Sequence, residues 1–404
     1  MNTCSDKPVD VLAKQGVVIP SPSSVFIDPS VAPENIAPGT VIHPFCRISG
    51  EKTSIGPKCV LGAEGPVTIE NCRLGAEVKL GGGYFSEATF LDNSGMGGGA
   101  HVRPGTLLEE FSSGAHAVGL KQTILFPYVT LGSLINFCDC LMSGGTGRKN
   151  HSEVGSSYIH FNFTPHQDKA TPSLIGDVSR GVLLDQPPIF LGGQGGLVGP
   201  ARIAFGAIIP AGMIIRKDVL NAGLAVGDEK IKAAGGGTGA YRSIDRIVRN
   251  NLIYIGNIYA LKMWYGRVRS QFMAVDKFQS ACLAGGREQL DTILNERISR
   301  LEELAKKMPL SMELNEKSGN GEAPYLQKQK VFAEGWQKMK DEIYLLAGFE
   351  GDADKRDAVL AELAAISTGK KYLDAMPALT PKAKACASAW LQSIVDRTTE
   401  IWKT

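Results

Sequence analysis

The sequence lacks a long apolar run, a strong excess of one charge and an apolar segment near its start. Its longest apolar stretch, residues 203–215, covers about 13 residues, which is too short to span a bilayer. The 43 Lys and Arg residues nearly balance the 41 Asp and Glu residues, so no basic field argues for nucleic acid. The segment from Met1 to Lys7 has no apolar region of the secretory type. We therefore expect a cytoplasmic protein without a nucleic-acid or membrane partner.

The eight cysteines are scattered and form no C-x-x-C pair. Cys138 and Cys140 share one face of a predicted strand, which suits neither a disulfide nor a complete zinc site. We expect Cys46 and Cys59 to be core residues, because free cysteine is usually buried. A reducing cytoplasm is the simplest setting, and the sequence requires no metal.

Glycine, in contrast, is abundant at 47 residues, and a short repeat explains it. Steps of six residues, broken by a step of seven after every third repeat, separate the aliphatic residues Ile36, Ile42, Ile48, Ile55, Leu61, Val67, Leu74 and Leu80. The full pattern therefore returns after about 19 residues, as expected for three short strands per coil. One aliphatic side chain per repeat points inward, and the next residue turns a corner. The small residues four places on share the interior: Thr40, Cys46, Cys59 and Gly65.

This repeat predicts a parallel β-helix of the hexapeptide type over residues 24–220, after an extended N-terminal segment, residues 1–23. A Gly-rich linker, residues 221–240, leads to a helical domain over residues 241–404, where apolar residues recur at spacings of three and four. The first helix is expected to begin near Tyr241, and the others span about 286–307, 324–347, 353–366 and 380–402. The predicted fold class is thus a β-solenoid followed by an all-α domain. We expect the four tryptophans, all in the second half, to be packing anchors.

Four stretches interrupt the repeat, and loops that leave a rigid solenoid are where a site forms. These stretches are residues 81–99, 141–152, 163–172 and 192–196. A basic run within the second one, Arg148, Lys149 and His151, is read as a solvated surface.

The first candidate site residues are cationic. His101 and Arg103 share one face of a predicted strand, and Arg offers a bidentate fork to a phosphate. Lys121 adds a second positive charge for the same anion. The alternative is a solvated outer face with no ligand.

A second group lies on the strand before the third interruption. Tyr158, His160 and Asn162 share one face, opposite three apolar residues, which predicts a lined cleft. His160 is a candidate general base, because a neutral imidazole accepts a proton near pH 7. His166 in the following loop is the rival for that role, and a structural role for either histidine remains the alternative.

Several of these segments together resemble a known family. They are Val102-Arg-Pro-Gly-Thr, Lys121, the segment Gly155 to Phe163 with its loop to Leu174-Ile-Gly-Asp, and Ile209-Pro-Ala-Gly-Met-Ile-Ile-Arg-Lys-Asp-Val. They look like the left-handed β-helix domain of the bifunctional glucosamine-1-phosphate acetyltransferase/N-acetylglucosamine-1-phosphate uridylyltransferase, over roughly residues 15–220.

The resemblance implies roles for individual residues. Arg103 and Lys121 would bind the phosphate of a sugar phosphate or nucleotide sugar, Asn162 would contact the amino sugar, and Lys169 matches the family's loop lysine. Tyr158 is a further candidate for substrate binding because it shares a predicted strand face with Asn162. The last coils, near Ala211 and Arg216, would hold acetyl-CoA or another acyl-CoA as co-substrate. The resemblance also implies a homotrimer with sites between neighbouring solenoids.

Three departures from the family are apparent. The uridylyltransferase domain and its Gly-rich nucleotide loop have no counterpart, and the helical domain has none in the family. The position of the family's catalytic histidine, about a dozen residues past Lys121, is Ser133 here.

The leading hypothesis is an acyl-CoA-dependent acyltransferase on a sugar phosphate. The alternatives are a catalytically silent protein that binds sugar nucleotides or serves assembly, and a subunit that works with a separate nucleotidyltransferase.

Overall fold

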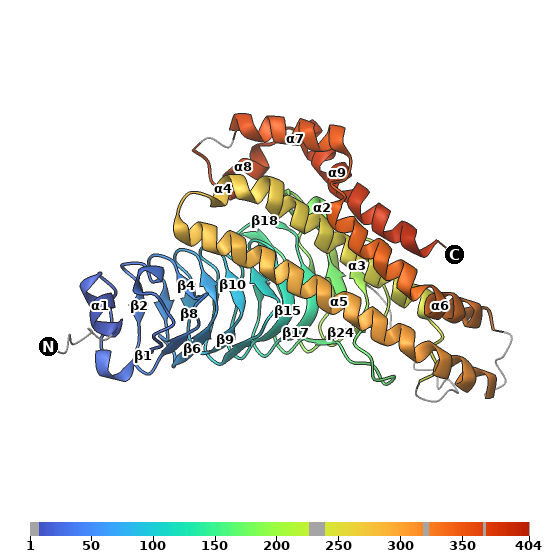
Figure 1. Ribbon diagram of the computed structural model, residues 1–404, viewed down its shortest axis with the longest axis horizontal. Helices are drawn as coiled ribbons and strands as arrows, with labels where there is room; N and C mark the ends of the chain where they lie inside the picture. Colours follow the sequence, from blue (N-terminus) through green and yellow to red (C-terminus); the bar gives the residue numbers. More distant parts are fainter. Residues whose placement is uncertain (1–7, 226–238, 318–322, 367–368, 404) are drawn as a thin grey trace.

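The computed structural model describes residues 8–225, 239–317, 323–366 and 369–403. It consists of a parallel β-solenoid of about 11 turns, with a layer of C-terminal helices laid along one of its sides (Figure 1). The predicted fold class is therefore confirmed.

The solenoid has three faces, and each face is a ladder of parallel strands one coil apart. Face A is the ten-stranded sheet of β2 (Val41–Ile42), β5 (Val60–Leu61), β8 (Lys79–Leu80), β11 (Gly95–Met96), β14 (Ser113–Gly114), β16 (Thr130–Leu131), β20 (Glu153–Val154), β23 (Phe190–Leu191), β26 (Ala207–Ile209) and β28 (Gly223–Leu224). Face B consists of β1 (Phe26–Ile27), β3 (Arg47–Ser49), β6 (Val67–Glu70), β9 (Gly83–Ser86), β12 (Ala100–Val102), the first halves of β15 (Gly119–Leu125) and β17 (Asn136–Met142), β21 (Ile159–Phe161), β24 (Gly196–Val198) and β27 (Ile214–Ile215). Face C consists of β4 (Ser54–Ile55), β7 (Arg73–Leu74), β10 (Ala88–Phe90), β13 (Thr106–Leu108), the second halves of β15 and β17, β22 (Ser173–Ile175) and β25 (Arg202–Ile203).

The interior follows the predicted repeat. The aliphatic residues from Ile36 to Leu80 are almost completely buried, as are Thr40, Cys46 and Cys59 at the small inward positions. Gly65 is only half-buried. Cys46 and Cys59 are therefore core residues, as expected.

The corners between faces use left-handed backbone. At the corner between faces B and C, six coils place a positive φ at Gly50, Asn71, Glu87, Gly105, Gln122 and Asp139. One such residue lets the chain change direction without a longer loop, and Gly adopts this conformation at no steric cost. Functional side chains at a corner are consequently stacked in rows, one coil above the next.

The N-terminal segment differs from the expected extended lead-in. Residues Pro8–Lys14 form helix α1, and its Leu12 is completely buried. Val18 already pairs with Val41 as a parallel bridge. The first coil has no coil before it, so its apolar end needs a cover of this kind. At the other end β28 extends the solenoid to Leu224, while most of the predicted linker, residues 226–238, lies outside the described residues.

Face C is apolar on its outside as well as its inside. Leu107, Ile124, Leu141 and Leu174 point outward, yet none is more than 3% exposed. Helix α5 (Lys277–Lys317) crosses this face from β4 to β15, and α3 (Ile244–Trp264) contacts β22 (Figure 1). Burying a side chain of this type contributes about 1.5–3 kcal/mol, so the covered face holds the two parts together.

The helices agree in most positions with the predicted ones. The remaining helices are α2 (Val178–Gly181), α4 (Ser270–Met273), α6 (Pro324–Leu345), α7 (Ala353–Ile366), α8 (Tyr372–Ala378) and α9 (Pro381–Thr399). The short α2, α4 and α8 were not predicted, and α5 is longer than the expected 286–307. All four tryptophans are at least 93% buried, which confirms their expected role as packing anchors.

Buried ion pairs fix the helices on the solenoid. The guanidinium of Arg269 is fully buried and donates to both carboxylate oxygens of Glu110, each at 2.8 Å. It also lies 3.3 Å from Glu109, which accepts a hydrogen bond from the hydroxyl of Tyr265 at 2.6 Å. Apolar contact is non-directional, so these paired groups determine the position of the helices along face C.

We predict that Arg269→Met destabilises the protein by about 3–5 kcal/mol, because it leaves buried carboxylates without their partner. Urea unfolding measures the change. Arg249→Met is the matched control, since the side chain of Arg249 is 55% exposed and pairs with Asp245 on the same helix. Arg249→Met is expected to lower the free energy of unfolding by less than about 1 kcal/mol. Equal losses for the two variants would contradict a structural role of the buried pair.

Candidate functional site

Arg103 and Lys121 lie on neighbouring coils at the edge between faces B and C. The pairing of Val102 with Leu120 places them one coil apart, and Lys121 pairs in turn with Cys138. Nη2 of Arg103 lies 3.5 Å from Sγ of Cys138, and its Nε is buried without a partner in the described residues. The side chain of Lys121 makes no hydrogen bond within the described chain. Two cations with unused donors are therefore brought together.

Asn162 and Lys169 approach the same edge from the following loop. Nδ2 of Asn162 donates to Asp139 at 3.4 Å, and Asp139 accepts from Arg297 of α5 at 2.7 Å. Arg297 also donates to the backbone oxygen of Lys169 at 3.2 Å, while the Lys169 side chain is exposed. The four residues Arg103, Lys121, Asn162 and Lys169 thus surround one corner, and α5 forms one of its sides.

Tyr158 and His160 do not line an open cleft. The predicted alternation is present, but its direction is reversed. Tyr158 is completely buried and His160 is 2% exposed, whereas Ile159, Phe161 and Phe163 on the other side are 41%, 39% and 57% exposed. The pairing of His160 with Leu197, an interior residue, sets this register. The side chains of Tyr158 and His160 therefore belong to the interior of the solenoid.

Both ring nitrogens of His160 are occupied. Nδ1 lies 2.5 Å from the carbonyl oxygen of Cys138 and must donate to it, so Nε2 accepts from the hydroxyl of Ser173 at 2.8 Å. Burial lowers the pKa of His160 to about 4. This residue is neutral near pH 7 and has no free lone pair, so the geometry gives no support to its assignment as a general base.

His166 is also held by hydrogen bonds. Its Nδ1 accepts from the backbone N–H of Gly239 at 2.9 Å, and its ring lies 4.6 Å from that of Tyr241. In the neutral ring Nε2 then carries the proton and cannot accept another. The geometry does not favour this histidine as a base either, and both assignments stay predictions.

A different histidine lies beside the serine at the expected base position. Nδ1 of His116 is 2.7 Å from Oγ of Ser133, at the exposed corner between faces A and B. Gly114 pairs with Leu131 on the next coil, and the same register places residue 116 beside residue 133. His116 was not among the predicted site residues, because its proximity to Ser133 follows from the pairing of coils and not from spacing along the chain.

The same corner continues toward the predicted acyl-CoA residues. The ladder Leu131, Val154, Leu191 and Ile209 aligns Ser133 with Ser156, Gly193 and Ala211 on successive coils. Ala211 therefore lies three coils beyond Ser133, or about 14 Å at the usual strand spacing. Arg216 is exposed on the last coils, where it donates to the carbonyl oxygen of Ile214 at 3.4 Å.

The two groups of polar residues flank face B. His116 and Ser133 lie at the edge shared with face A, and Arg103 and Lys121 lie at the edge shared with face C. Lys121 is five residue steps after His116, so the Cα atoms of these two residues are at most about 17 Å apart. Between them the outer surface carries Gly119 and Asn136, which are small or polar. A phosphorylated ligand lying across this surface would contact both edges.

The remaining polar runs show no comparable arrangement. Arg148 lies in the hairpin of β18 (Gly145–Gly147) and β19 (Asn150–His151), with its guanidinium 4.1 Å from the centre of the Phe111 ring. Among the described residues no group of three His, Cys, Asp or Glu side chains could hold a metal ion. None of the described helices is long and apolar enough to cross a membrane.

These features define the class of protein: a hexapeptide-repeat β-solenoid with polar residues in rows along its corners and a helical C-terminal part. No protein-family model matches the chain. It is similar to the bifunctional protein GlmU of Pelobacter propionicus, with 30% identity over 216 residues, which is 53% of this chain and 42% of that protein. The bifunctional protein GlmU of Thermotoga petrophila is 29% identical over 220 residues, 54% of this chain and 44% of that protein. The chain thus spans less than half the length of these curated relatives, and the predicted resemblance is confirmed.

We predict that His160 makes the protein less stable in acid. The unfolded chain binds a proton at this residue near pH 6.5, whereas the folded chain binds it only near pH 4. The free energy of unfolding therefore falls as the pH drops between these values, by about 3 kcal/mol in total. Urea titrations at pH 7, 6 and 5 measure this slope.

His160→Gln should be less stable at pH 7 and should show a shallower slope than the wild type. His101→Gln is the control, because His101 is exposed on face B and its loss should leave the slope unchanged. If His160→Gln keeps the full slope, another group causes the acid sensitivity.

Proposed function

We propose that this protein is an acyl-CoA-dependent acyltransferase that acts on an amino or hydroxyl group of a sugar phosphate or nucleotide sugar. The observation that carries the proposal is the placement of two complementary groups at opposite edges of the same coils. Arg103 and Lys121 offer unused cationic donors at one edge, and His116 with Ser133 offers a base at the other. Similarity to the bifunctional protein GlmU over half of the chain supports the same class of reaction.

The cations would position the acceptor. Arginine binds phosphate through two parallel hydrogen bonds and lysine adds a point charge. Asn162 and Lys169 lie close enough to this corner to contact the sugar. Holding the acceptor in this way makes its attack on the acyl group effectively unimolecular.

His116 would remove the proton of the acceptor. When Nδ1–H donates to Oγ of Ser133, the lone pair of Nε2 faces solvent, and Nε2 has no hydrogen bond in the described residues. The acceptor nitrogen or oxygen forms a bond to the thioester carbon, the C–S bond breaks, and the proton passes through Nε2 to the departing sulfur. Ser133 is a positioning residue here, because it fixes which nitrogen is free.

The row of small residues on the A–B corner provides a path for the acyl donor. Ser156, Gly193 and Ala211 follow Ser133 on successive coils and carry little bulk. An extended donor chain running along this row would bring its thioester to His116 while its other end lies near Ala211 and Arg216.

Self-association through the uncovered faces is part of the proposal. The helices cover face C, and the exposed apolar residues Phe190, Ile208 and Leu224 form a continuous ladder on face A, at 41%, 44% and 63% exposure. Apolar side chains aligned in this way suit contact with another copy of the chain. A homotrimer, as the resemblance implies, would bury this ladder.

The rival proposal is a protein that binds a sugar nucleotide without turnover. Its supporting observation is the loop from Phe163 to Ala170, which is tied to the helical part. Lys307 donates to the backbone oxygens of His166 and Gln167, and Asn251 donates to that of Ala170. A loop held in this way is less free to close over a substrate. A third alternative is that the protein is a subunit that works with a separate nucleotidyltransferase. In that case the two polypeptides are expected to co-purify.

We predict that His116→Gln lowers kcat for acetyl transfer from acetyl-CoA to glucosamine-1-phosphate by about 10²–10⁴-fold, the usual contribution of a positioned base. Arg103→Met should instead act mainly on KM, raising it about tenfold or more through the loss of a charged hydrogen bond. Release of free thiol measures both. His151→Gln, in the β18–β19 hairpin on the side of the solenoid opposite face B, is the control and should retain activity.

Unchanged kcat in His116→Gln would remove this histidine from the mechanism. Calorimetry separates the rival: binding of the sugar phosphate with no heat on titration of coenzyme A, and no turnover in the wild type, would support a binding protein.

We further predict that the double substitution Phe190→Glu and Ile208→Glu dissociates the trimer, because it places charges in an apolar contact. Sedimentation velocity of wild type and variant measures the change. Lys79→Glu alters the same face at an exposed position far from the ladder and should leave the sedimentation coefficient as in the wild type. A wild type that sediments as a monomer would refute self-association.

A further inference from the structure

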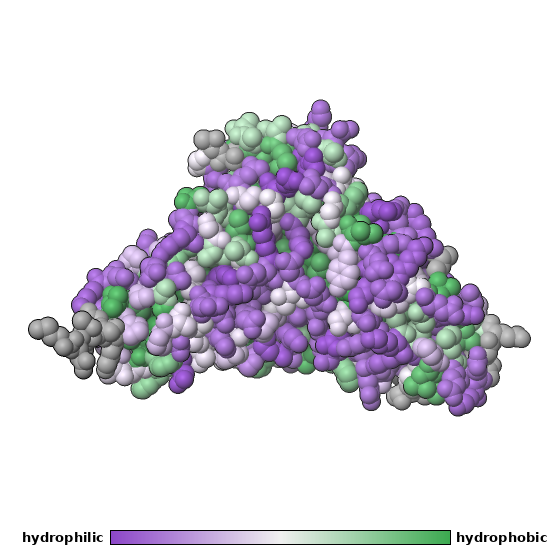
Figure 2. All heavy atoms as spheres, in the orientation of Figure 1, coloured by the Kyte–Doolittle hydropathy of each residue, from purple (hydrophilic) through white to green (hydrophobic). Residues whose placement is uncertain are grey.

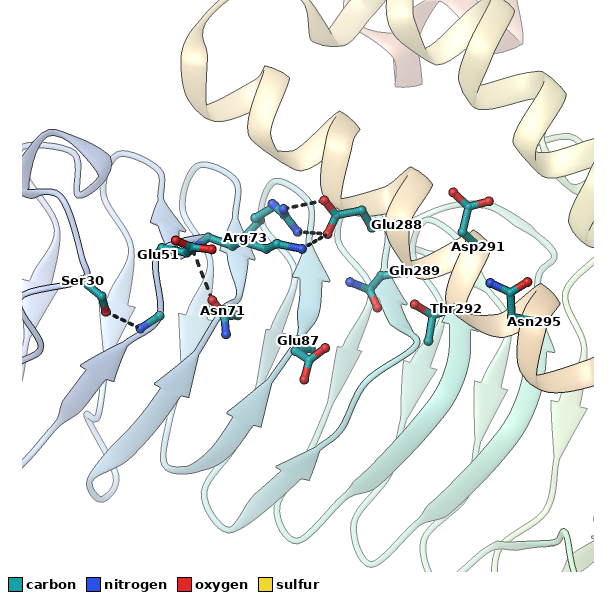
Figure 3. Close-up of a pocket in the computed structure, with 12 residues that line it drawn as sticks. Ser30, Glu51, Asn71, Arg73, Glu87, Glu288, Gln289, Asp291, Thr292 and Asn295 are labelled. Atoms are coloured by element: carbon teal, nitrogen blue, oxygen red, sulfur yellow. Dashed lines mark hydrogen bonds and ion pairs between the residues drawn. The ribbon is translucent and has the colours of Figure 1, made fainter. Parts of the chain in front are cut away.

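A cavity lies away from the proposed acyl-transfer residues, where α5 passes over the B–C corner of the early coils. It has a volume of about 620 Å³ and opens on a side of the molecule that is largely hydrophilic (Figure 2). Corner residues such as Glu51 and Glu87 form one wall, and Gln289 and Asp291 of α5 form the other (Figure 3). Both parts of the chain therefore contribute to it.

The cations of this cavity are already neutralised. Arg73 donates to both carboxylate oxygens of Glu288 at 3.0 Å, and Lys52 lies 3.4 Å from the same carboxylate (Figure 3). Burial raises the pKa of Glu288, but its bonds to Arg73 and Lys52 outweigh this and lower it overall. The arginine is held by its partner and is not free for an anion.

The acidic groups, in contrast, have spare capacity. The carboxylates of Glu51 and Glu87 make no hydrogen bond or ion pair with any described residue. Asp291 pairs with Lys262, outside the cavity lining. When Lys262 is counted with Lys52 and Arg73, three cations face four carboxylates, so one net negative charge remains and the cavity favours a positively charged group.

An unpaired donor also faces the cavity. Gln289 is only 4% exposed, and its Oε1 accepts from the backbone N–H of Gly105 at 2.9 Å. That bond fixes the orientation of the amide, and its Nε2 has no acceptor among the described residues and borders the cavity (Figure 3). The amide nitrogen is thus the donor of this nearly buried side chain that stays open to the cavity. A ligand oxygen would satisfy it.

We infer that this cavity binds a small polyhydroxylated cation. Its ammonium group would pair with the unpaired carboxylate of Glu87, and one hydroxyl oxygen would accept from Nε2 of Gln289. Further hydroxyls match the amide and hydroxyl groups of Asn71, Thr292 and Asn295, which also line the cavity. The inference does not depend on acyl transfer, because neither His116 nor Arg103 borders this cavity.

Calorimetry with the full chain tests it at pH 6.5 with three probes. Glucosamine carries both features, glucose has the hydroxyls without the charge, and putrescine has charge without hydroxyls. We expect glucosamine to bind at least fivefold more tightly than either of the others. No binding of glucosamine, or binding of glucose or putrescine as tight as that of glucosamine, would overturn the inference.

A matched pair of variants locates the binding. Glu87→Gln removes one unpaired carboxylate and should weaken glucosamine binding about tenfold, the effect of one charge-assisted hydrogen bond. Glu77→Gln makes the same change at another exposed corner residue with left-handed backbone, outside this cavity, and should change the affinity less than twofold. Equal affinities of the two variants would overturn the assignment to this cavity, whereas the acyl-transfer assay would be unaffected.

Discussion

The packing of helices on face C is the contact on which the rest of the structure depends. A solenoid of this kind needs only one apolar residue inward per strand, yet β13, β15, β17 and β22 carry a second one outward. Those outward residues, such as Leu107 and Leu174, are buried only because the helices lie over them. Buried carboxylates on the solenoid then pair with Arg269 and Arg297 from the helical part. Both candidate sites on the B–C corner take one side from α5 as a result.

Much of the fold was predictable because the interior follows a strict rule. Every third of a coil must bury one aliphatic residue, and that requirement fixed the period, the parallel ladders and the positions of Cys46 and Cys59. The helical half was recognisable from spacings of three and four, as in α3, where Ile244, Val248, Leu252 and Ile255 are all buried. Neither pattern indicates which face the helices cover, although the paired apolar residues at 107–108, 124–125 and 141–142 carried that information.

The candidate site was less accessible from sequence, for reasons that differ between its members. Arg103 and Lys121 were predicted to act together, and the register places them on adjacent coils. The alternation around His160 was read correctly but with the wrong side facing out, because an interruption precedes this strand and hides the phase of the repeat. His116 escaped notice because its relation to Ser133 exists only between coils. The cavity under α5 unites residues more than 200 positions apart, as in the contact of Arg73 with Glu288.

Helix α5 has a consequence for how the protein loses its structure. A bare stack of coils contacts only its nearest neighbours, so its turns can fray singly from either end. Here the 41-residue helix α5 donates hydrogen bonds to both ends of the covered region: Lys277 bonds to the carbonyl oxygen of Glu34, and Lys307 bonds to that of Gln167. Early and late turns of the solenoid therefore contact the same helix. Melting is expected to be concerted across the covered turns, and gradual only at the first and last ones.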